Sequence, residues 1–269
     1  MNYISTNHRG GLGNVMFKLA AAIGVALDNK IEYLFSNEFL RPIDQITTHG
    51  LPDYRRFYDN VLRNITFINE LPKPYITYVE DHFHYKPIPY QLGTNLLLEG
   101  GFQSEKYFQN NKQYIIDLFK PTVEIKELIL SNYPEINQFV SIHVRRGDYL
   151  NFPNHHPQQS LEYYQEAVNQ IGIDKTYIVF SDDVEGCKEM FEFIPNKFFF
   201  NSGTDWLDMY IMSMCEHNII CNSSFSWWAA YLNENTNKIV IAPKKWFGNV
   251  YASWDTSDLI PSTWQVLDK

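Results

Sequence analysis

Short apolar runs alternate with longer segments of helical periodicity along most of this chain. In the second half, apolar runs predict strands at Phe139–Val144, Thr176–Phe180, Lys197–Phe200, Asn218–Cys221 and Lys238–Ile241. Helical patterns predict helices from Pro121 to about Ser131 and at Leu161–Ile171, Val184–Phe191, Trp206–Cys215 and Ser226–Leu232. Alternating strands and helices indicate a parallel sheet and therefore a Rossmann-like domain.

The first half has fewer clear elements. Strands are predicted at Asn2–Thr6, Ile31–Phe35 and Leu96–Glu99, and helices at Val15 to about Leu27 and at Ser104–Phe119. The segment Pro52–Pro89 is rich in proline and aromatic residues, which predicts irregular structure. We therefore expect an α/β protein with an N-terminal domain at 1–120, a Rossmann-like domain at 121–245 and a C-terminal tail at 246–269.

Composition narrows the class of protein. Hydrophobic residues make up 45% of the 269 residues, which is enough for a substantial core. The net charge of −9 argues against a nucleic-acid partner, because no basic face would neutralise the phosphates. Cys187, Cys215 and Cys221 lack metal-ligand spacing and are typical of buried thiols in a reducing compartment.

The chain lacks the sequence patterns of a secretory signal peptide and of a membrane span. The start has no charged region followed by an apolar run, so it is not a signal peptide. No stretch approaches the ~18 consecutive apolar residues of a membrane span. A glycosylation sequon at Asn222 lies inside a serine-rich motif, which further weakens a secretory interpretation. These features favour a cytoplasmic protein without a membrane span.

The segment Val140–Tyr149 carries the densest chemistry. A run with β-branched residues predicts a buried strand, and Arg145, Arg146, Gly147 and Asp148 follow it directly. Ligands of open α/β sheets bind beyond the carboxyl ends of the strands. Two guanidinium groups at that place suit an anion such as phosphate, although a salt-bridged surface turn explains the segment almost as well.

Two further strand-to-helix turns have anion-binding character. His8-Arg9-Gly10-Gly11-Leu12-Gly13-Asn14 joins a strand to a helix, where glycines admit a ligand close to the backbone. This turn is not a dinucleotide fingerprint, because Met16 replaces the third glycine, and no Gly-Lys-Ser/Thr of a P-loop follows. In Asn222-Ser223-Ser224-Phe225-Ser226-Trp227-Trp228 the serines either hold an anion or cap the next helix.

Together these segments resemble a known family. The combination of four motifs is similar, in order and spacing, to the α-1,2-fucosyltransferases of glycosyltransferase family 11. The motifs are Gly10-Gly11-Leu12-Gly13-Asn14, His143-Val144-Arg145-Arg146-Gly147-Asp148-Tyr149, Phe180-Ser181-Asp182-Asp183 and Ser223-Ser224-Phe225-Ser226-Trp227-Trp228-Ala229. Val15-Met16-Phe17-Lys18 and His155-His156-Pro157-Gln158-Gln159 depart from the family pattern, and these departures concern the acceptor more than the donor.

The resemblance implies a fold and a reaction. The fold is two facing Rossmann-like domains, the glycosyltransferase B type. The reaction is an inverting transfer of L-fucose from GDP-β-L-fucose to the 2-hydroxyl of a galactose-terminated glycan. The sequence contains no Asp-x-Asp motif, so we expect no metal ion and no other cofactor. A fixed guanidinium would then stabilise the departing diphosphate.

The resemblance also implies roles for single residues. Arg145 is expected to contact the diphosphate, and Arg146 to be structural, paired with Asp182 or Asp183. Asp148 is either the general base or the ion-pair partner of a nearby arginine, and a loop with His155 and His156 is an alternative source of the base. The other expected GDP-fucose contacts are Gly11, Gly13, Asn14, His143, Asp208, Ser224, Phe225 and Ser226.

Several alternatives stay open. His143 is otherwise a core histidine, and Asp208 a helix-surface charge on a helix whose N-cap is Asp205. The chain is otherwise a transferase for another sugar nucleotide or acceptor, or a nucleotide-binding relative without catalysis. Arg146-Gly147-Asp148 spells an adhesion tripeptide, but it directly follows a buried strand rather than lying on a long exposed loop.

Overall fold

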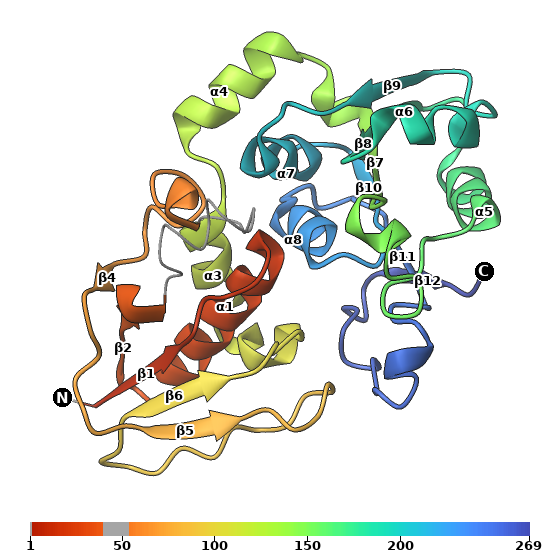
Figure 1. The fold of residues 1–269 in the computed structure, drawn as a ribbon. Coiled ribbons are helices and arrows are strands. Elements are labelled where there is room, and N and C mark those ends of the chain that lie inside the picture. The colour runs from red at the N-terminus through yellow and green to blue at the C-terminus, as the bar shows by residue number, and fades with distance from the viewer. Residues whose placement is uncertain (1, 40–53) are drawn as a thin grey trace. The chain divides into compact units, whose positions relative to one another are not determined.

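The computed structural model describes residues 2–39 and 54–269 of the chain (Figure 1). The chain divides into two compact units by its internal contacts. The first unit comprises residues 1–120 and 254–261, and the second comprises residues 121–253 and 262–269. Both are built from helices and parallel sheets, which confirms the predicted α/β class. That the two units face one another stays a prediction from the sequence.

The first unit contains a four-stranded sheet with the order β2-β1-β6-β5, in which every pair is parallel. The strands are β1 (Tyr3–Thr6), β2 (Glu32–Tyr33), β5 (Ile76–Val79) and β6 (Leu96–Glu99). All four residues of β1 are buried, and β1 lies between its successor β2 and the late strand β6. The strand order therefore reverses beside β1, which is where open α/β sheets leave a crevice at the carboxyl end.

Helix α1 (Leu12–Asp28) follows β1 and packs against it. It contains an uninterrupted run of buried residues from Leu19 to Ala26, as expected for a helix covered on nearly all sides. A Cβ on Gly24 would lie 2.4 Å from the carbonyl oxygen of Tyr107, so only glycine lets the chain at Glu105–Tyr107 approach the helix. That segment is a 3₁₀ turn followed by another at Gln109–Asn111 and by α3 (Lys112–Phe119), which together occupy the predicted helix at Ser104–Phe119.

Two predictions for the first unit are corrected. The single strand predicted at Ile31–Phe35 is two strands, because β2 pairs with β1 whereas β3 (Phe35–Ser36) pairs with β4 (Phe67–Ile68) in a separate two-stranded sheet. The segment predicted as irregular contains both β4 and β5. β5 is a four-residue edge strand, and it was missed because it lies within the proline-rich segment that was predicted as irregular throughout.

The second unit contains a six-stranded parallel sheet with the order β12-β11-β10-β7-β8-β9. The strands are β7 (Phe139–Val144), β8 (Thr176–Ser181), β9 (Lys197–Phe200), β10 (His217–Ile219), β11 (Val240–Pro243) and β12 (Gln265–Leu267). The chain builds outward from β7 through β8 to β9 and then returns to place β10, β11 and β12 on the other side. This is the strand order of a Rossmann fold, and it confirms the Rossmann-like prediction for this unit.

Helix α4 (Val123–Asn132) precedes the first strand of this sheet. The helices between its strands are α5 (Leu161–Ile171), α6 (Val184–Cys187), α7 (Asp205–Ser213) and α8 (Ser224–Leu232). Short 3₁₀ turns lie at Asn37–Phe39, Tyr54–Phe57, Ile136–Gln138, Asp148–Leu150, Glu189–Phe191 and Asn249–Tyr251. The prediction that Asp205 caps α7 is wrong: Thr204 is the N-cap, and Asp205 is the first helical residue, whose Oδ1 accepts the amide of Trp206.

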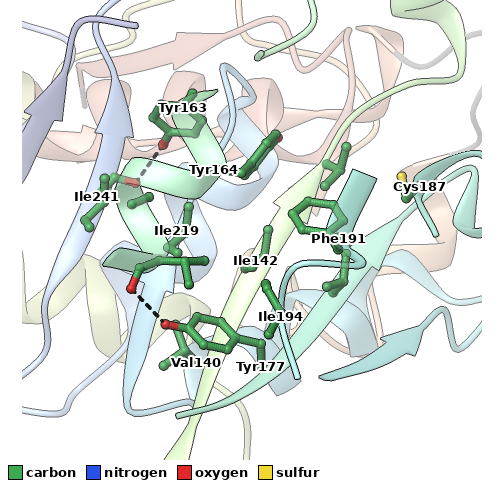
Figure 2. Packing of buried hydrophobic residues seen from close by; sticks show 14 residues of the cluster. Val140, Ile142, Tyr163, Tyr164, Tyr177, Cys187, Phe191, Ile194, Ile219 and Ile241 are labelled. Carbon is green, nitrogen blue, oxygen red and sulfur yellow. Dashed lines mark hydrogen bonds between the residues drawn. The ribbon is translucent and has the colours of Figure 1, made fainter. Parts of the chain in front are cut away.

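The core of the second unit joins its central strands to the helices beside them (Figure 2). Val140 and Ile142 of β7 pack in one cluster with Tyr163 and Tyr164 of α5. The buried tyrosine hydroxyls remain satisfied, because Tyr163 donates to the carbonyl of Ile220 at 2.6 Å. This packing fixes the carboxyl ends of β7 and β8, which are followed by Arg145 and Asp182.

The last residues of the chain belong to the two units and do not form a separate tail. β12 extends the sheet of the second unit beside β11, whereas residues 254–261 belong to the first unit. β12 was missed because its Gln265 and Val266 are exposed at the sheet edge. Within residues 2–39 and 54–269, no helix has the length and apolarity that crossing a bilayer requires.

Candidate functional site

The carboxyl ends of β7 and β10 define the main candidate site. These two strands are neighbours, and the strand order reverses between them, which is the place where open α/β sheets bind their ligands. Arg145 follows β7 directly, and the segment Cys221–Ser223 joins β10 to α8. We call residues 145–148 the arginine turn.

Arg145 is clamped by two carboxylates. Its Nε and Nη2 lie 2.9 and 2.7 Å from Oδ1 of Asp148, and its Nη1 lies 3.0 Å from Oδ2 of Asp182. Burial alone would lower the pKa of Arg145, but the two carboxylates outweigh it and raise that pKa. The guanidinium is therefore a permanent cation held in one orientation.

Arg146 has a different set of contacts. Its Nε donates to Oδ2 of Asp183 at 2.9 Å and its Nη1 to Gln158 at 3.3 Å, which confirms the predicted pairing with Asp183. Its backbone amide donates to Oδ1 of Asp182 at 2.9 Å. Asp182 thus links the backbone of one arginine to the side chain of the other.

Gly147 is required by this linkage. A Cβ at Gly147 would lie 2.4 Å from Oδ2 of Asp182, the oxygen that binds Arg145. Any side chain at position 147 would therefore displace the carboxylate from the guanidinium. The glycine of the motif serves the arginine clamp rather than a left-handed turn.

His143 and Cys221 form a buried pair beneath the arginine turn. The sulfur of Cys221 lies 3.2 Å from Nδ1 of His143, and the two residues are 1% and 6% exposed. Burial, reinforced by the charge of Arg145, lowers the pKa of His143 to about 3. Burial likewise raises the pKa of Cys221 to about 12, so both groups are neutral at physiological pH.

The start of α8 lies next to this pair. The rings of His143 and Phe225 have their centroids 5.4 Å apart. Ser223 caps the helix, because its hydroxyl accepts the amide of Phe225 at 3.3 Å. Ser226 is fully buried and donates to the carbonyl of Ser223 at 3.2 Å, so its hydroxyl has an internal partner, whereas Ser224 is half-buried.

Aromatic rings cover the outer side of the arginine turn. Tyr149 places its ring 5.9 Å from the guanidinium carbon of Arg145, and its hydroxyl donates to the carbonyl of Asn222 at 2.9 Å. His156 stacks on Tyr149 at a centroid distance of 4.9 Å. The loop expected to close over an acceptor is anchored here, because Gly248 donates its amide to the carbonyl of His155 at 2.9 Å.

Asp208 lies in the first turn of α7 and contacts a different segment. Its Oδ1 accepts the amide of Ser202 at 3.0 Å, and Ser202 belongs to the segment between β9 and α7. Burial raises the pKa of Asp208, and the hydrogen bonds from Ser202 oppose that rise. The structure therefore joins Asp208 to the loop after β9 rather than leaving it as a solvated surface charge.

The first unit carries its own strand-end turn, residues 7–11, which we call the glycine turn. Gly10 has a φ of +130°, a conformation that favours glycine, and Gly11 is the N-cap of α1 without a side-chain cap. No atom of the described residues lies within 4 Å of the position that a Cβ on Gly11 would occupy. Gly13 is buried in α1, and Oδ1 of Asn14 accepts from Gln103 at 3.0 Å.

Lys18 and His8 support the glycine turn from within. Nζ of Lys18 donates to Oδ1 of Asn7 at 2.9 Å and to the carbonyl of Arg9 at 2.8 Å. His8 is fully buried, and within the described part of the chain neither of its ring nitrogens has a hydrogen-bond partner. Burial, together with the charges of Lys18 and Arg9, lowers the pKa of His8 to about 4.

The geometry thus gathers His143, Arg145, Asp148 and Phe225 at the carboxyl ends of β7 and β10. Cys221 and Tyr149 also lie there and were given no role from the sequence, whereas Asp182, expected as a possible partner of Arg146, binds the side chain of Arg145. The signal for Asp182 was present, since it follows β8, the strand beside β7. Among residues 2–39 and 54–269, no group of three or more histidine, cysteine, aspartate or glutamate side chains is arranged to hold a metal ion. The arrangement places a fixed guanidinium beside an exposed carboxylate at the ends of these strands.

Comparison with known proteins identifies relatives over the whole chain. The model of the family described as "Glycosyl transferase family 11" matches residues 1–267. An α-1,2-colitosyltransferase of Escherichia coli is 27% identical over 301 residues, covering 100% of both chains. The human galactoside α-(1,2)-fucosyltransferase 1 is 31% identical over 107 residues, covering 35% of this chain and 28% of that protein. A crystal structure of POFUT1 in complex with GDP shares the fold at 12% identity with a TM-score of 0.51, covering 90% of this chain and 98% of that one.

Proposed function

The chain belongs to glycosyl transferase family 11, and we propose that it transfers L-fucose from GDP-β-L-fucose to the 2-hydroxyl of a galactose-terminated glycan. In this proposal the anomeric centre inverts, and Arg145 takes the place of a metal ion. The relatives named as α-1,2-fucosyl- and α-1,2-colitosyltransferases support both the linkage and a deoxyhexose donor.

The clamped Arg145 is the observation that carries the proposal. As the bond to the sugar breaks, negative charge grows on the diphosphate, and a donor already fixed at that place stabilises it without reorganising. A guanidinium has five N–H donors, of which Nε donates to Asp148, while the two terminal nitrogens form ion pairs with Asp148 and Asp182. The terminal nitrogens carry four hydrogens for these two contacts and can therefore also bind phosphate oxygens.

Asp148 is our candidate for the general base. Both of its contacts with Arg145 use Oδ1, so Oδ2 retains its capacity to accept the proton of the acceptor hydroxyl. The side chain is 57% exposed, which gives an acceptor access to it. Inversion needs one such base and one displacement, in which the hydroxyl oxygen bonds to the anomeric carbon as the bond to the diphosphate breaks.

We propose that the nucleotide is recognised by His143 together with Ser224 and Phe225 at the start of α8, and by Asp208 in the first turn of α7. Phe225 offers an aromatic face for the base or ribose, and a carboxylate is a suitable acceptor for the N1 and N2 donors of guanine. Since Asp208 already holds Ser202, it would select guanine either directly or by shaping that loop. GDP should therefore bind more tightly than ADP or UDP, and Asp208→Asn should reduce that preference.

A colitose donor is the second candidate. The relative that matches this chain from end to end is named for colitose, a sugar that lacks the 3-hydroxyl of fucose. A competition between GDP-fucose and GDP-colitose at equal concentration separates the two proposals, because their products differ in mass by one oxygen atom.

The decisive experiment combines donor, acceptor and metal. The protein is incubated with each GDP-sugar and an array of galactose-terminated glycans, with and without excess EDTA, and the linkage is determined by NMR. We expect an α-1,2 linkage to galactose at a rate that EDTA leaves unchanged. Loss of activity in EDTA that manganese or magnesium restores would refute the metal-free mechanism, and a β linkage would refute inversion.

A further inference from the structure

The buried contact between Cys221 and His143 has no role in the proposal above. His143 has two ring nitrogens, and only Nδ1 makes a hydrogen bond within the described residues. Nε2 has no partner among the described residues, so it is the ring nitrogen available to a ligand. Which nitrogen carries the proton therefore decides whether His143 presents a donor or an acceptor to a ligand.

The surroundings of the sulfur decide the position of that proton. The sulfur of Cys221 has two hydrogen-bond partners among the described residues. The thiol hydrogen has two possible acceptors, Nδ1 of His143 at 3.2 Å and the hydroxyl of Ser226 at 3.9 Å. Ser226 uses its own hydrogen on the carbonyl of Ser223.

The shorter contact defines the tautomer. If Nδ1 carried the proton, it would donate to the sulfur, and the thiol hydrogen would be left with only the distant Ser226 oxygen. If Nδ1 is unprotonated, it accepts the thiol hydrogen over the shorter distance, and every group of the cluster is satisfied. The second arrangement places the ring proton on Nε2.

We propose that Cys221 is a positioning residue, whose thiol holds His143 in the Nε2–H tautomer so that Nε2–H donates to an oxygen acceptor of the bound nucleotide. The inference deepens the proposed function and rests on it only for the identity of that nucleotide. The pair is neutral rather than a thiolate–imidazolium ion pair, since burial lowers the pKa of His143 and raises that of Cys221. Cys221 is accordingly a hydrogen-bond donor here and not a nucleophile.

The tautomer is measured directly in the protein without ligand. Long-range ¹H–¹⁵N NMR of protein labelled with ¹⁵N-histidine distinguishes protonated from unprotonated ring nitrogens, and His143→Gln identifies the signals of His143. We expect Nδ1 to be unprotonated and Nε2 to be protonated throughout pH 6 to 8. A proton on Nδ1, or on both nitrogens, overturns the proposal whatever the protein binds.

Variants test the role of the thiol. Cys221→Ser retains a donor and should keep the tautomer, with a KM for the donor substrate within about threefold of wild type. Cys221→Ala removes the donor and should give mixed tautomers and a KM raised about tenfold, the effect of losing roughly one hydrogen bond. Cys215→Ala is the matched control, because Cys215 is equally buried but its thiol contacts the carbonyl of Ile211 instead.

Nucleotide titration separates this inference from the proposed function. GDP, GMP and guanosine are added to the labelled protein, and the Nε2–H signal of His143 is followed. A shift with GDP and GMP but not guanosine assigns the acceptor to a phosphate, and a shift with all three assigns it to the nucleoside. If GDP binds without moving that signal, the contact with the nucleotide is refuted, whereas failure of all three to bind refutes the proposed function instead. Should Cys221→Ala not fold, the wild-type tautomer and Cys221→Ser still decide the matter.

Discussion

The arginine turn and the glycine turn occupy equivalent places in two different sheets. Each follows the first strand of its unit, at a point where the strand order reverses. The arginine turn is held by side chains, with three carboxylates binding two guanidinium groups. The glycine turn is held mainly through backbone and by one lysine, and it leaves open space beside Gly11.

This difference indicates a division of labour. A side chain held by opposite charges on two sides keeps one orientation, as stabilisation of a developing charge requires. A turn with an open glycine instead presents backbone N–H groups at a helix start, which can bind a ligand but add no formal charge. Changes in the arginine turn should therefore reduce turnover, and changes in the glycine turn should reduce affinity.

Arg145→Ala should have the largest effect. It removes the clamped cation, and loss of one fixed donor from a charge-stabilising site typically costs about 10²–10³ in kcat. Arg145→Lys should also be poor, because an ammonium cannot replace the bidentate fork between Asp148 and Asp182. Steady-state kinetics with GDP-fucose, together with circular dichroism to verify folding, provide the measurement.

Arg146→Lys is the control for this comparison. It retains the charge beside Asp183 and, on our interpretation, affects packing of the turn rather than chemistry. Its kcat should remain within about fivefold of wild type. Near-normal turnover in Arg145→Ala, or a larger loss in Arg146→Lys, would show that the two arginines have been assigned in the wrong order.

Gly147→Ala should have the second largest effect, and it tests whether the clamp matters rather than the cation alone. Its Cβ would lie 2.4 Å from the Asp182 oxygen, so the carboxylate must move away from Arg145. We expect kcat to fall about 10- to 100-fold while GDP affinity changes less, since a misplaced charge loses mainly transition-state stabilisation. Isothermal titration with GDP and single-turnover kinetics measure the two quantities. An unchanged kcat would mean that Asp182 does not orient Arg145 during the reaction.

The sequence predicted the buried strands and helices of the protein better than the side-chain contacts between them. β7 and α5 have the predicted bounds, and β8 ends one residue later than predicted, because buried strands and an amphipathic helix leave strong periodic patterns. The short edge strands β5 and β12 were missed, whereas the edge strand β9 was predicted from its run of three phenylalanines. The adjacent arginines Arg145 and Arg146 were recognised in the sequence, but the role of Asp182 depends on the register that places Val144 beside Ser181. The contact between Cys221 and His143 likewise depends on the pairing of β10 with β7, which local sequence does not encode.

Gly11→Ala should have a smaller effect and tests the ligand role of the glycine turn. Within the described residues nothing opposes a methyl group at this position, and its φ of −71° suits any residue. Stability should therefore be unchanged, whereas a substrate lying against the backbone would meet the new methyl group. We expect KM to rise about 3- to 10-fold with kcat nearly constant.

Gly10→Ala is the matched change for that test. Its φ of +130° strains any residue with a Cβ, and the added atom would lie 3.2 Å from Cβ of Asn14. Thermal or urea unfolding should reveal a loss of about 1–3 kcal/mol. If Gly11→Ala leaves every kinetic constant unchanged, the glycine turn is structural, and the proposed contacts of Gly11 with substrate are wrong.

His8→Leu should have the smallest effect, and it concerns only the stability of the glycine turn. His8 is fully buried against Phe67, and its pKa falls from 6.5 to about 4 on folding, so the unfolded chain binds the extra proton between these values. Wild-type stability should therefore decline as the pH falls through this window, by up to about 1.4 kcal/mol per pH unit for this one group. Leucine removes that contribution. Because neither ring nitrogen has a partner in the described part of the chain, the substitution should lower the free energy of unfolding only slightly at pH 7.

Urea unfolding of both proteins at several pH values from 4 to 8 measures the difference in their free energies of unfolding. This difference should grow in favour of the variant below pH 6.5. Parallel pH profiles would mean that His8 takes up its proton as readily in the folded protein as in the unfolded chain, which would contradict the lowered pKa of His8.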